Sequence, residues 1–378
     1  MSTVQTSDPV SVDVPAKQIR APATREEHQP NHSTGTAGAS NDAEPQTQAT
    51  IGMPTPSEAI LGVEVDLDDG DSGIAGVDTS TLSQSVRSSV YEFVEENGRT
   101  YHRYKEGQYF LPNDESEQER LDLQHHLFLL TFNNQLYLSP AGQLHNVLDI
   151  GTGTGIWAID FALRHPSAHV TGTDLSPIQP ASIPPNCTFL IDDAEEDDWL
   201  LPTKFDLIHG RALASCFKDA QKVIDSAVKS LVPGTGWLEF QDLVLPMGCV
   251  DDSWEGSTLQ RWNNTMVECA GRVGRDLSYS QRYRAMFAKA LLVDVQERHF
   301  LWPSNTWVKG RHYKKIATWF LKDLSDGLEA ISLQILTRVA GMSKEEVTTL
   351  LEDVRKDLAD PKIHAYMRVT VTMGRKAA

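Results

Sequence analysis

The sequence predicts an α/β fold in which helices cover a mostly parallel β-sheet. Short runs rich in Val, Ile and Leu, which favour strands, alternate with longer stretches whose apolar residues recur at helical spacing. Three closely spaced glycines, Gly151, Gly153 and Gly155, join the first such run to a helix-like segment. Strands that alternate with helices form parallel sheets, and such sheets bind ligands at the carboxyl ends of their strands.

The strands of this sheet can be placed in chain order. Five apolar runs are expected to form its first strands: residues 147–150, 170–173, 188–191, 205–209 and 237–240. Helices are expected among them at 156–163 and 220–231, and Pro233-Gly234 is a stop signal for the second.

Beyond the fifth strand the pattern loosens. Helices are expected at residues 254–273, 279–291, 313–324, 328–340 and 343–358, and two more strands at 293–301 and 363–373. Ser343 and Glu346 form a capping box at the start of the last helix. Helical insertions near 252–291 and 304–360 are therefore expected to roof the substrate site.

The first 82 residues differ in composition from the rest of the chain. Residues 1–80 contain no Phe, Trp or Tyr, and they carry a formal charge of −10 out of −18 for the whole chain. Such a segment buries too little apolar surface to offset the entropy of ordering, so we expect a disordered acidic tail over 1–82. The negative balance of the remainder argues against partners such as nucleic acid or anionic membranes.

Other whole-chain features point to an intracellular protein. The N-terminus lacks the apolar core of a secretory signal, and no apolar run is long enough to span a bilayer. The four cysteines (Cys187, Cys216, Cys249 and Cys269) are scattered without metal-binding spacing, so we expect a reducing compartment and no metal.

Residues 83–140 are expected to form an N-terminal helical cap on the domain that follows, 141–378. A first helix is expected at 83–96, and a second at about 116–133, which carries His125 and His126. Between them, residues 99–112 are dense in aromatic and cationic side chains. This run fits either a flap that closes over a ligand or an extended arm packed on the core.

The glycine loop indicates the ligand. It reads G-x-G-x-G, whereas dinucleotide-binding loops read G-x-G-x-x-G. Asp149 stands two residues before the first glycine, where an acid would repel a pyrophosphate but suits an ammonium group. Asp174 ends the next strand, at the spacing of an acid that binds ribose hydroxyls. S-adenosylmethionine has an ammonium group and a ribose but no phosphate, so it is the expected cofactor.

Two further points concern this site. Past the third strand, Asp192 or Asp193 is placed to meet an adenine amine, and the remaining acids of this run are expected to face solvent. In the alternative interpretation, the glycines serve only helix–sheet packing and Asp174 is a helix cap.

Several longer motifs resemble those of the LaeA-like (UMTA-type) methyltransferases of filamentous fungi. These motifs are Leu111-Pro112-Asn113-Asp114-Glu115, Asp149-Ile150-Gly151-Thr152-Gly153-Thr154-Gly155-Ile156-Trp157, Asp174-Leu175-Ser176-Pro177 and Ile208-His209-Gly210-Arg211. The resemblance implies a class I methyltransferase (Rossmann-like) fold with seven strands and bound S-adenosylmethionine. The expected cofactor contacts are Asp149, Gly151, Thr152, Gly153, Gly155, Asp174, Leu175, Asp192 and Asp193.

The sequence departs from the family pattern in two places. Residues 233–237 are one residue longer than the usual Pro-Gly-Gly-Trp, and Ala290-Leu291-Leu292 replaces the usual Ala-Gly-Phe. Both lie away from the glycine loop, so they bear on local turn geometry rather than on activity.

Methyl transfer requires aligned reactants in a dry pocket, and some nucleophiles also need a general base. The candidate catalytic residues are His209, at the end of the fourth strand, and His125 or His126, with Glu239 a weaker candidate. For each histidine the alternative is a core or surface role. Arg211 could hold an acidic substrate, or it could pair with Asp206 or Asp219.

Three functions fit these observations. The first is a cytoplasmic methyltransferase that acts on a small-molecule intermediate of fungal secondary metabolism. The second, which the LaeA resemblance permits, is a regulatory methyltransferase with protein partners in a nuclear complex. The third is a binding module without turnover, against which the intact Asp149 and glycine loop argue.

Deleting residues 1–80 is expected to leave the melting temperature and the cofactor affinity nearly unchanged, because this segment lacks residues that form a core. Thermal denaturation and calorimetry of the full and shortened chains test this expectation. A clear loss of thermal stability would show instead that the acidic segment docks on the fold.

Overall fold

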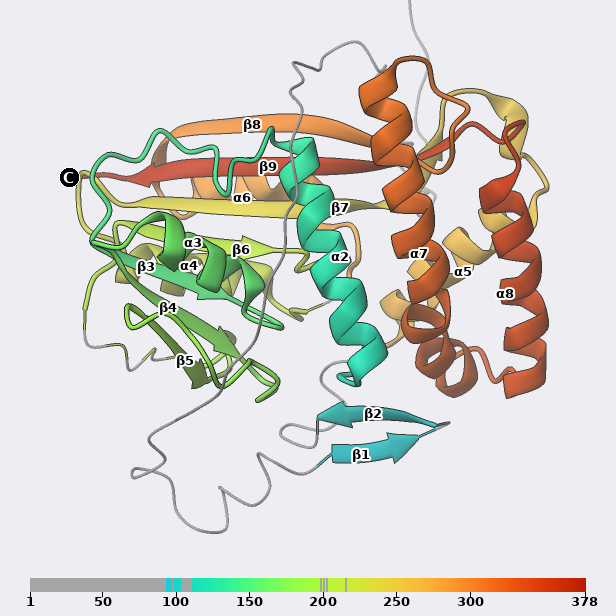
Figure 1. Cartoon of the computed structure of the whole chain (residues 1–378), viewed down its shortest axis with the longest axis horizontal. Helices are drawn as coiled ribbons and strands as arrows, with labels where there is room; N and C mark the ends of the chain where they lie inside the picture. Colours follow the sequence, from blue (N-terminus) through green and yellow to red (C-terminus); the bar gives the residue numbers. More distant parts are fainter. Residues whose placement is uncertain are drawn as a thin grey trace, which may run out of the picture. The chain divides into compact units, whose positions relative to one another are not determined.

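The computed structural model describes residues 93–96, 98–102, 111–197, 199, 201, 203–214 and 216–378. Seven strands form one sheet in the order β5-β4-β3-β6-β7-β9-β8 (Figure 1). Their bounds are β3 Asn146–Ile150, β4 His169–Asp174, β5 Cys187–Ile191, β6 Leu207–Arg211, β7 Trp237–Cys249, β8 Leu292–Pro303 and β9 Ala365–Lys376. The strands from β5 to β7 run parallel, and β9 pairs antiparallel with both β7 and β8. The predicted seven-stranded, mostly parallel sheet is confirmed.

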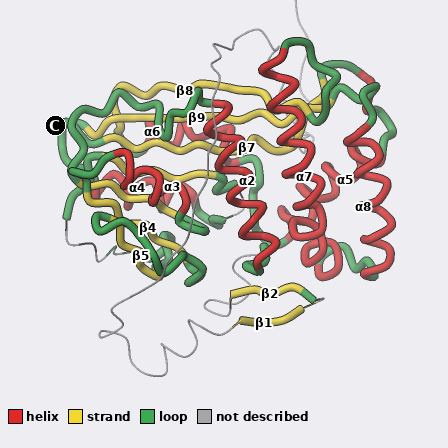
Figure 2. Tube along the Cα trace, viewed as in Figure 1, coloured by secondary structure: helices red, strands yellow, loops and turns green. Residues whose placement is uncertain are grey.

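Helices cover both faces of this sheet, and in the central strands β3 and β6 alternate residues enter different hydrophobic clusters. Val147 and Leu207 face the larger cluster, whereas Leu148 and Ile208 face a smaller one. The larger cluster includes residues of α2 (Glu115–Thr131), α3 (Ile156–Arg164), α5 (Thr258–Arg272), α7 (Arg311–Arg338) and α8 (Lys344–Ala359). The smaller includes residues of α4 (Ala220–Ser230), η2 (Tyr279–Arg282) and α6 (Tyr283–Lys289). Figure 2 shows how these helices flank the strands.

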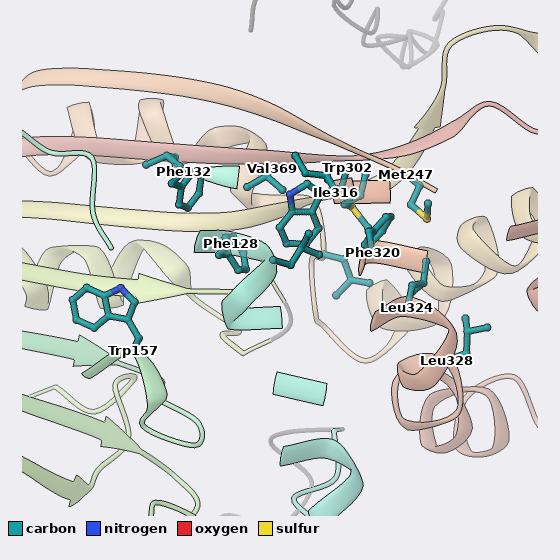
Figure 3. Packing of buried hydrophobic residues seen from close by; sticks show 14 of the residues in the cluster. Phe128, Phe132, Trp157, Met247, Trp302, Ile316, Phe320, Leu324, Leu328 and Val369 are labelled. Atoms are coloured by element: carbon teal, nitrogen blue, oxygen red, sulfur yellow. The ribbon is translucent and has the colours of Figure 1, made fainter. Parts of the chain in front are cut away.

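The centre of the larger cluster joins the cap helix α2 to β8 and α7. Trp302 of β8 is fully buried, and its ring meets those of Phe128 and Phe320 at centroid distances of 4.8 and 5.4 Å (Figure 3). Its indole N–H donates to the Thr131 hydroxyl at 2.7 Å. Residues far apart in sequence thereby fix α2 against the sheet.

The described part of the N-terminal region is a hairpin rather than the end of a helix. Strands β1 (Phe93–Glu96) and β2 (Arg99–His102) pair antiparallel around Gly98, whose φ is +83°. Glu96 forms an ion pair with Arg338 of α7, and Arg99 pairs with Asp114, the N-cap of α2. The predicted helix at 83–96 is therefore wrong for its last four residues, and its start lies outside the described residues. Residues 103–110, most of the expected flap or arm, also lie outside them.

The insertions contain one long helix, α7, where two helices were expected. The expected break fell near Gly327, which in sequence resembles a helix end. A side chain at this position would bring a Cβ within 2.6 Å of the Arg120 side chain. Gly327 thus allows α2 and α7 to approach closely, and the helix continues through it. The segment expected as one helix at 279–291 divides into η2 and α6, and the helix expected from 254 is preceded by a short turn, η1 (Asp252–Trp254).

The capping box at Ser343 and Glu346 is confirmed at the start of α8. None of the helices in the described part of the chain is long and apolar enough to cross a membrane.

Glu239 of β7 holds the connection between α2 and β3 onto the sheet. Its carboxylate is 0% exposed and accepts hydrogen bonds from the backbone N–H groups of Leu138 and Ser139 at 2.9 and 2.6 Å. The Gln241 amide also donates to it, at 2.9 Å. Glu239, the weaker candidate for a general base, thus forms hydrogen bonds that stabilise the fold.

Replacing Glu239 by Ala is expected to lower the free energy of unfolding by about 3–5 kcal/mol, because it leaves several buried donors without an acceptor. Chemical denaturation measures this change. Glu268→Ala is the matched control, since Glu268 is exposed and pairs only with Arg272 of its own helix. Equal stabilities of the two variants would contradict the role given to Glu239.

Candidate functional site

The turn from β3 into α3 can be made only by glycine. Gly151, Gly153 and Gly155 all have positive φ angles, of +62°, +59° and +82°. A Cβ on Gly155 would also lie 2.4 Å from the Phe189 ring. Backbone conformations of this kind favour glycine, so the spacing seen in the sequence is set by the turn itself.

A cavity of about 110 Å³ lies at the carboxyl ends of β3, β4, β5 and β6. Its walls come from the glycine loop, from the segments after these strands and from the start of α2. Six of the nine expected cofactor contacts line it: Gly151, Gly153, Asp174, Leu175, Asp192 and Asp193. The other three, Asp149, Thr152 and Gly155, do not line it.

Asp174 is the acid most closely tied to the loop. Its carboxylate accepts hydrogen bonds from the backbone N–H groups of Gly153 and Ser176, at 2.8 and 2.9 Å. Burial raises the pKa of Asp174 to about 6, and the negative charge of Asp149 acts in the same direction. The two backbone hydrogen bonds oppose this shift.

Asp149 and His209 form a buried pair beneath the loop. Asp149 is 3% exposed, and its oxygens accept from the Thr152 hydroxyl at 2.6 Å and from Nδ1 of His209 at 2.7 Å. His209 is 0% exposed, and its Nε2 has no hydrogen-bond partner among the described residues. A proton on Nε2 would be a buried donor without an acceptor, so we assign the neutral tautomer with the proton on Nδ1.

His209 does not border the cavity, contrary to the expectation from sequence. Its ring stacks on Trp157 of α3, with centroids 3.8 Å apart and planes within 3°. The imidazole therefore fills the layer between β6 and α3. The structure gives it the packing role that was the alternative.

Arg211, at the end of β6, does line the cavity. Its Nη2 donates to Nδ1 of His125 at 3.0 Å, and its guanidinium lies 4.9 Å from the centroid of the Phe128 ring. Nε2 of His125 lies 3.3 Å from Oδ2 of Asp160. Burial lowers the pKa of His125 to about 4, so at neutral pH this ring is uncharged and can accept from Arg211 while it donates to Asp160.

The partners proposed for Arg211 from sequence are wrong. Asp206 accepts from the backbone N–H groups of His145 and Asn146. Asp219 is the N-cap of α4. Both acids thus form hydrogen bonds with nearby backbone groups, and these bonds could not be predicted from their separation from Arg211 in sequence.

His126 points away from the cavity although it adjoins His125 in sequence. It is exposed and lines a separate surface groove with Trp319 of α7, at a ring distance of 6.5 Å. Buried His125 lines the same groove, whereas His209 is enclosed between β6 and α3.

A second cavity, of about 150 Å³, adjoins the first. Most of its lining is apolar and comes from α2, β7, α5 and α7, including Leu243, Trp262, Met266, Phe320, Leu324 and Ile331. The two cavities share Leu121 and Ala212 as lining residues. Ala212 has a φ of +54°, a strained conformation for a residue with a side chain, and such strain is concentrated at functional sites. Nothing in the sequence marked Leu121 or Ala212.

A buried ionic cluster contributes Arg120 and Asp323 to the polar part of the second cavity, which also includes Gln124, Asn263 and Arg275. Arg120 makes two hydrogen bonds to Glu117, of 3.0 and 2.7 Å, and one of 3.0 Å to Asp323 of α7. Burial raises the pKa of Asp323, although the Arg120 charge opposes this shift. Glu117 lines the first cavity, whereas Arg120 and Asp323 line the second.

A mostly parallel seven-stranded sheet with a glycine loop after β3 and a cavity at its strand ends defines a class I methyltransferase. In agreement, a family model described as a methyltransferase domain matches residues 116–312, just over half of the chain.

Relatives of known name identify the family within the class I methyltransferases. The secondary metabolism regulator LAE1 of Cochliobolus heterostrophus is 35% identical over 288 residues, which cover 74% of this chain and 94% of that protein. The methyltransferase pytC of Aspergillus terreus is 34% identical over 325 residues, with coverages of 85% and 98%. The protein-methionine methyltransferase laeA of Emericella nidulans is 33% identical over 295 residues, with coverages of 77% and 79%.

The chain therefore belongs to the LaeA-like methyltransferases, as its motifs led us to expect. It is an S-adenosylmethionine-dependent methyltransferase, and S-adenosylmethionine is its cofactor. Among the described residues, no group of three or more His, Cys, Asp or Glu side chains could hold a metal ion.

Proposed function

We propose that this enzyme methylates a small, largely apolar acceptor that binds in the second cavity. The observation that carries this proposal is the contact between the two cavities at Leu121 and Ala212. A methyl group moving from one cavity to the other would pass apolar side chains. Because transfer to a nucleophile gains from alignment and from exclusion of water, a dry junction suits this reaction.

The first cavity suits the cofactor in charge and shape. The bare backbone of Gly151 and Gly153 leaves room for close approach, and the Asp174 carboxylate is an acceptor for ribose hydroxyls. Asp192 and Asp193, after β5, are placed for the adenine amine. Asp149 stabilises the loop through its hydrogen bond from the Thr152 hydroxyl and adds negative charge near the ammonium group. The cofactor supplies the methyl group, and these residues bind and orient it.

The affinity for S-adenosylhomocysteine is expected to fall about tenfold between pH 7 and pH 5. The pKa of Asp174 is about 6, so the acid is mostly ionised at pH 7 and mostly protonated at pH 5, where it is a poorer acceptor for ribose hydroxyls. Calorimetric titrations at both pH values measure this change. Asp174→Asn should bind weakly at both, and a wild-type affinity that is the same at both would exclude this role for Asp174.

A second candidate function places the acceptor on a protein. Relatives named secondary metabolism regulators, and one named a protein-methionine methyltransferase, support it. An unbranched apolar side chain could enter the same cavity. The two candidates differ in whether the labelled product is a small molecule or a protein.

Cell extract from the source organism, incubated with the enzyme and methyl-labelled S-adenosylmethionine, is expected to yield label mainly among dialysable small molecules. Ile331→Trp should reduce this labelling strongly by filling the second cavity, because Ile331 lines it. Thr318→Trp is the matched control on α7, since Thr318 is exposed. Label that appears only in protein would overturn the small-molecule acceptor and favour the second candidate.

A further inference from the structure

Acidic side chains outnumber basic ones in the lining of the first cavity. Five acids line it: Glu117, Asp174, Asp192, Asp193 and Glu195. Arg211 is the one Lys or Arg among the described residues of this lining. S-adenosylmethionine carries two positive groups, the ammonium and the sulfonium, and one carboxylate. The acids can meet the positive groups, and among the described lining residues only Arg211 offers a positive charge to the carboxylate.

The guanidinium of Arg211 is held in place by its neighbours. One N–H group donates to His125, and Phe128 lies against its face. Within the described part of the chain, His125 is the hydrogen-bond partner of Arg211. A guanidinium has five N–H donors, and a cation that is largely removed from water is stable only with acceptors or an anion nearby. Burial lowers the pKa of Arg211 only to about 10, so it stays charged at neutral pH.

We propose that Arg211 binds the carboxylate at the methionine end of the cofactor. This inference rests on the proposed cofactor position in the first cavity. A guanidinium matches a carboxylate with two parallel hydrogen bonds. Asp122 and Asp149 lie close enough to Arg211 to raise its pKa, and they supply negative charge for the neighbouring ammonium group.

The order of the strands agrees with this orientation. Arg211 ends β6, Asp174 ends β4, and Asp192 follows β5. Since the sheet order is β5-β4-β3-β6, the adenine, ribose and methionine parts meet their partners in sequence along one edge.

His125 is a positioning residue in this arrangement. Its uncharged ring accepts from Arg211 through Nδ1, and Asp160 selects this tautomer by accepting from Nε2. A protonated His125 would have no lone pair for Arg211 and would repel it.

The test compares S-adenosylhomocysteine with its decarboxylated analogue, which has the same amine but no carboxylate. We expect wild-type enzyme to bind S-adenosylhomocysteine about 10- to 100-fold more tightly by calorimetry. Arg211→Met should remove this preference by weakening only the carboxylate-bearing ligand. Arg211→Lys, which keeps the charge but not the paired donors, should retain part of it.

His125→Gln tests the positioning role, with the exposed neighbour His126→Gln as its matched control. The first should reduce the preference for the carboxylate, and the second should leave it unchanged. An unchanged preference in His125→Gln would remove His125 from the inference.

The alternatives give different results. If the Arg211 variants weaken both ligands equally, Arg211 supports the fold rather than the carboxylate, and the proposal is overturned. If they weaken neither, it is overturned as well. If Arg211→Met does not fold, Arg211→Lys decides by the same comparison. Wild-type enzyme that binds neither ligand would instead refute the proposed cofactor site.

Discussion

The contact of one aromatic ring with two glycines is the constraint on which the site depends. Phe189 of β5 lies over Gly155, at the start of α3, and over Gly172 of β4, where added Cβ atoms would approach its ring to 2.4 and 2.7 Å. The ring therefore fixes β4, β5 and the turn after β3 relative to one another. Because the turn is fixed, its backbone forms a cavity wall, and the Gly153 N–H lies where Asp174 accepts it.

Beneath and beside this turn the enzyme buries polar groups that a purely structural core would avoid. Asp149 is bonded to His209, and Arg211 is bonded to His125 and through it to Asp160. Each buried charge carries a desolvation penalty that partners only partly offset. Arg211 lines the first cavity, and Asp149 stands two residues before Gly151, which lines it too, so this penalty is concentrated near the cavity. Elsewhere the faces of the sheet are filled mainly by apolar side chains.

Local structure could be predicted from the sequence more completely than contacts between residues far apart in the chain. The strand, glycine turn and helix at 146–164 could be predicted, because hydrophobic spacing and positive φ angles leave a direct trace in sequence. The predicted helix break near Gly327 was wrong, since in sequence a glycine that permits close helix packing cannot be distinguished from one that ends a helix. His209 looked catalytic at a strand end, yet its environment is set by Trp157 and Asp149, more than fifty residues earlier. The acceptor cavity was not predictable in detail because α2, β7, α5 and α7 each contribute part of it.

The Glu117–Arg120 ion pair has a consequence for how the two ligands influence each other. One member faces the first cavity and the other faces the second, and both are anchored through Asp323 to α7. A ligand that forms a hydrogen bond or an ion pair with Glu117 weakens the interaction of Glu117 with Arg120. The electrostatic potential of Arg120 in the second cavity then changes. If the cofactor and the acceptor bind in the two cavities as proposed, their binding is linked through this pair, and each ligand must alter the affinity of the other by the same factor. The pair gives the enzyme a route to cooperative assembly of its ternary complex without any movement of domains.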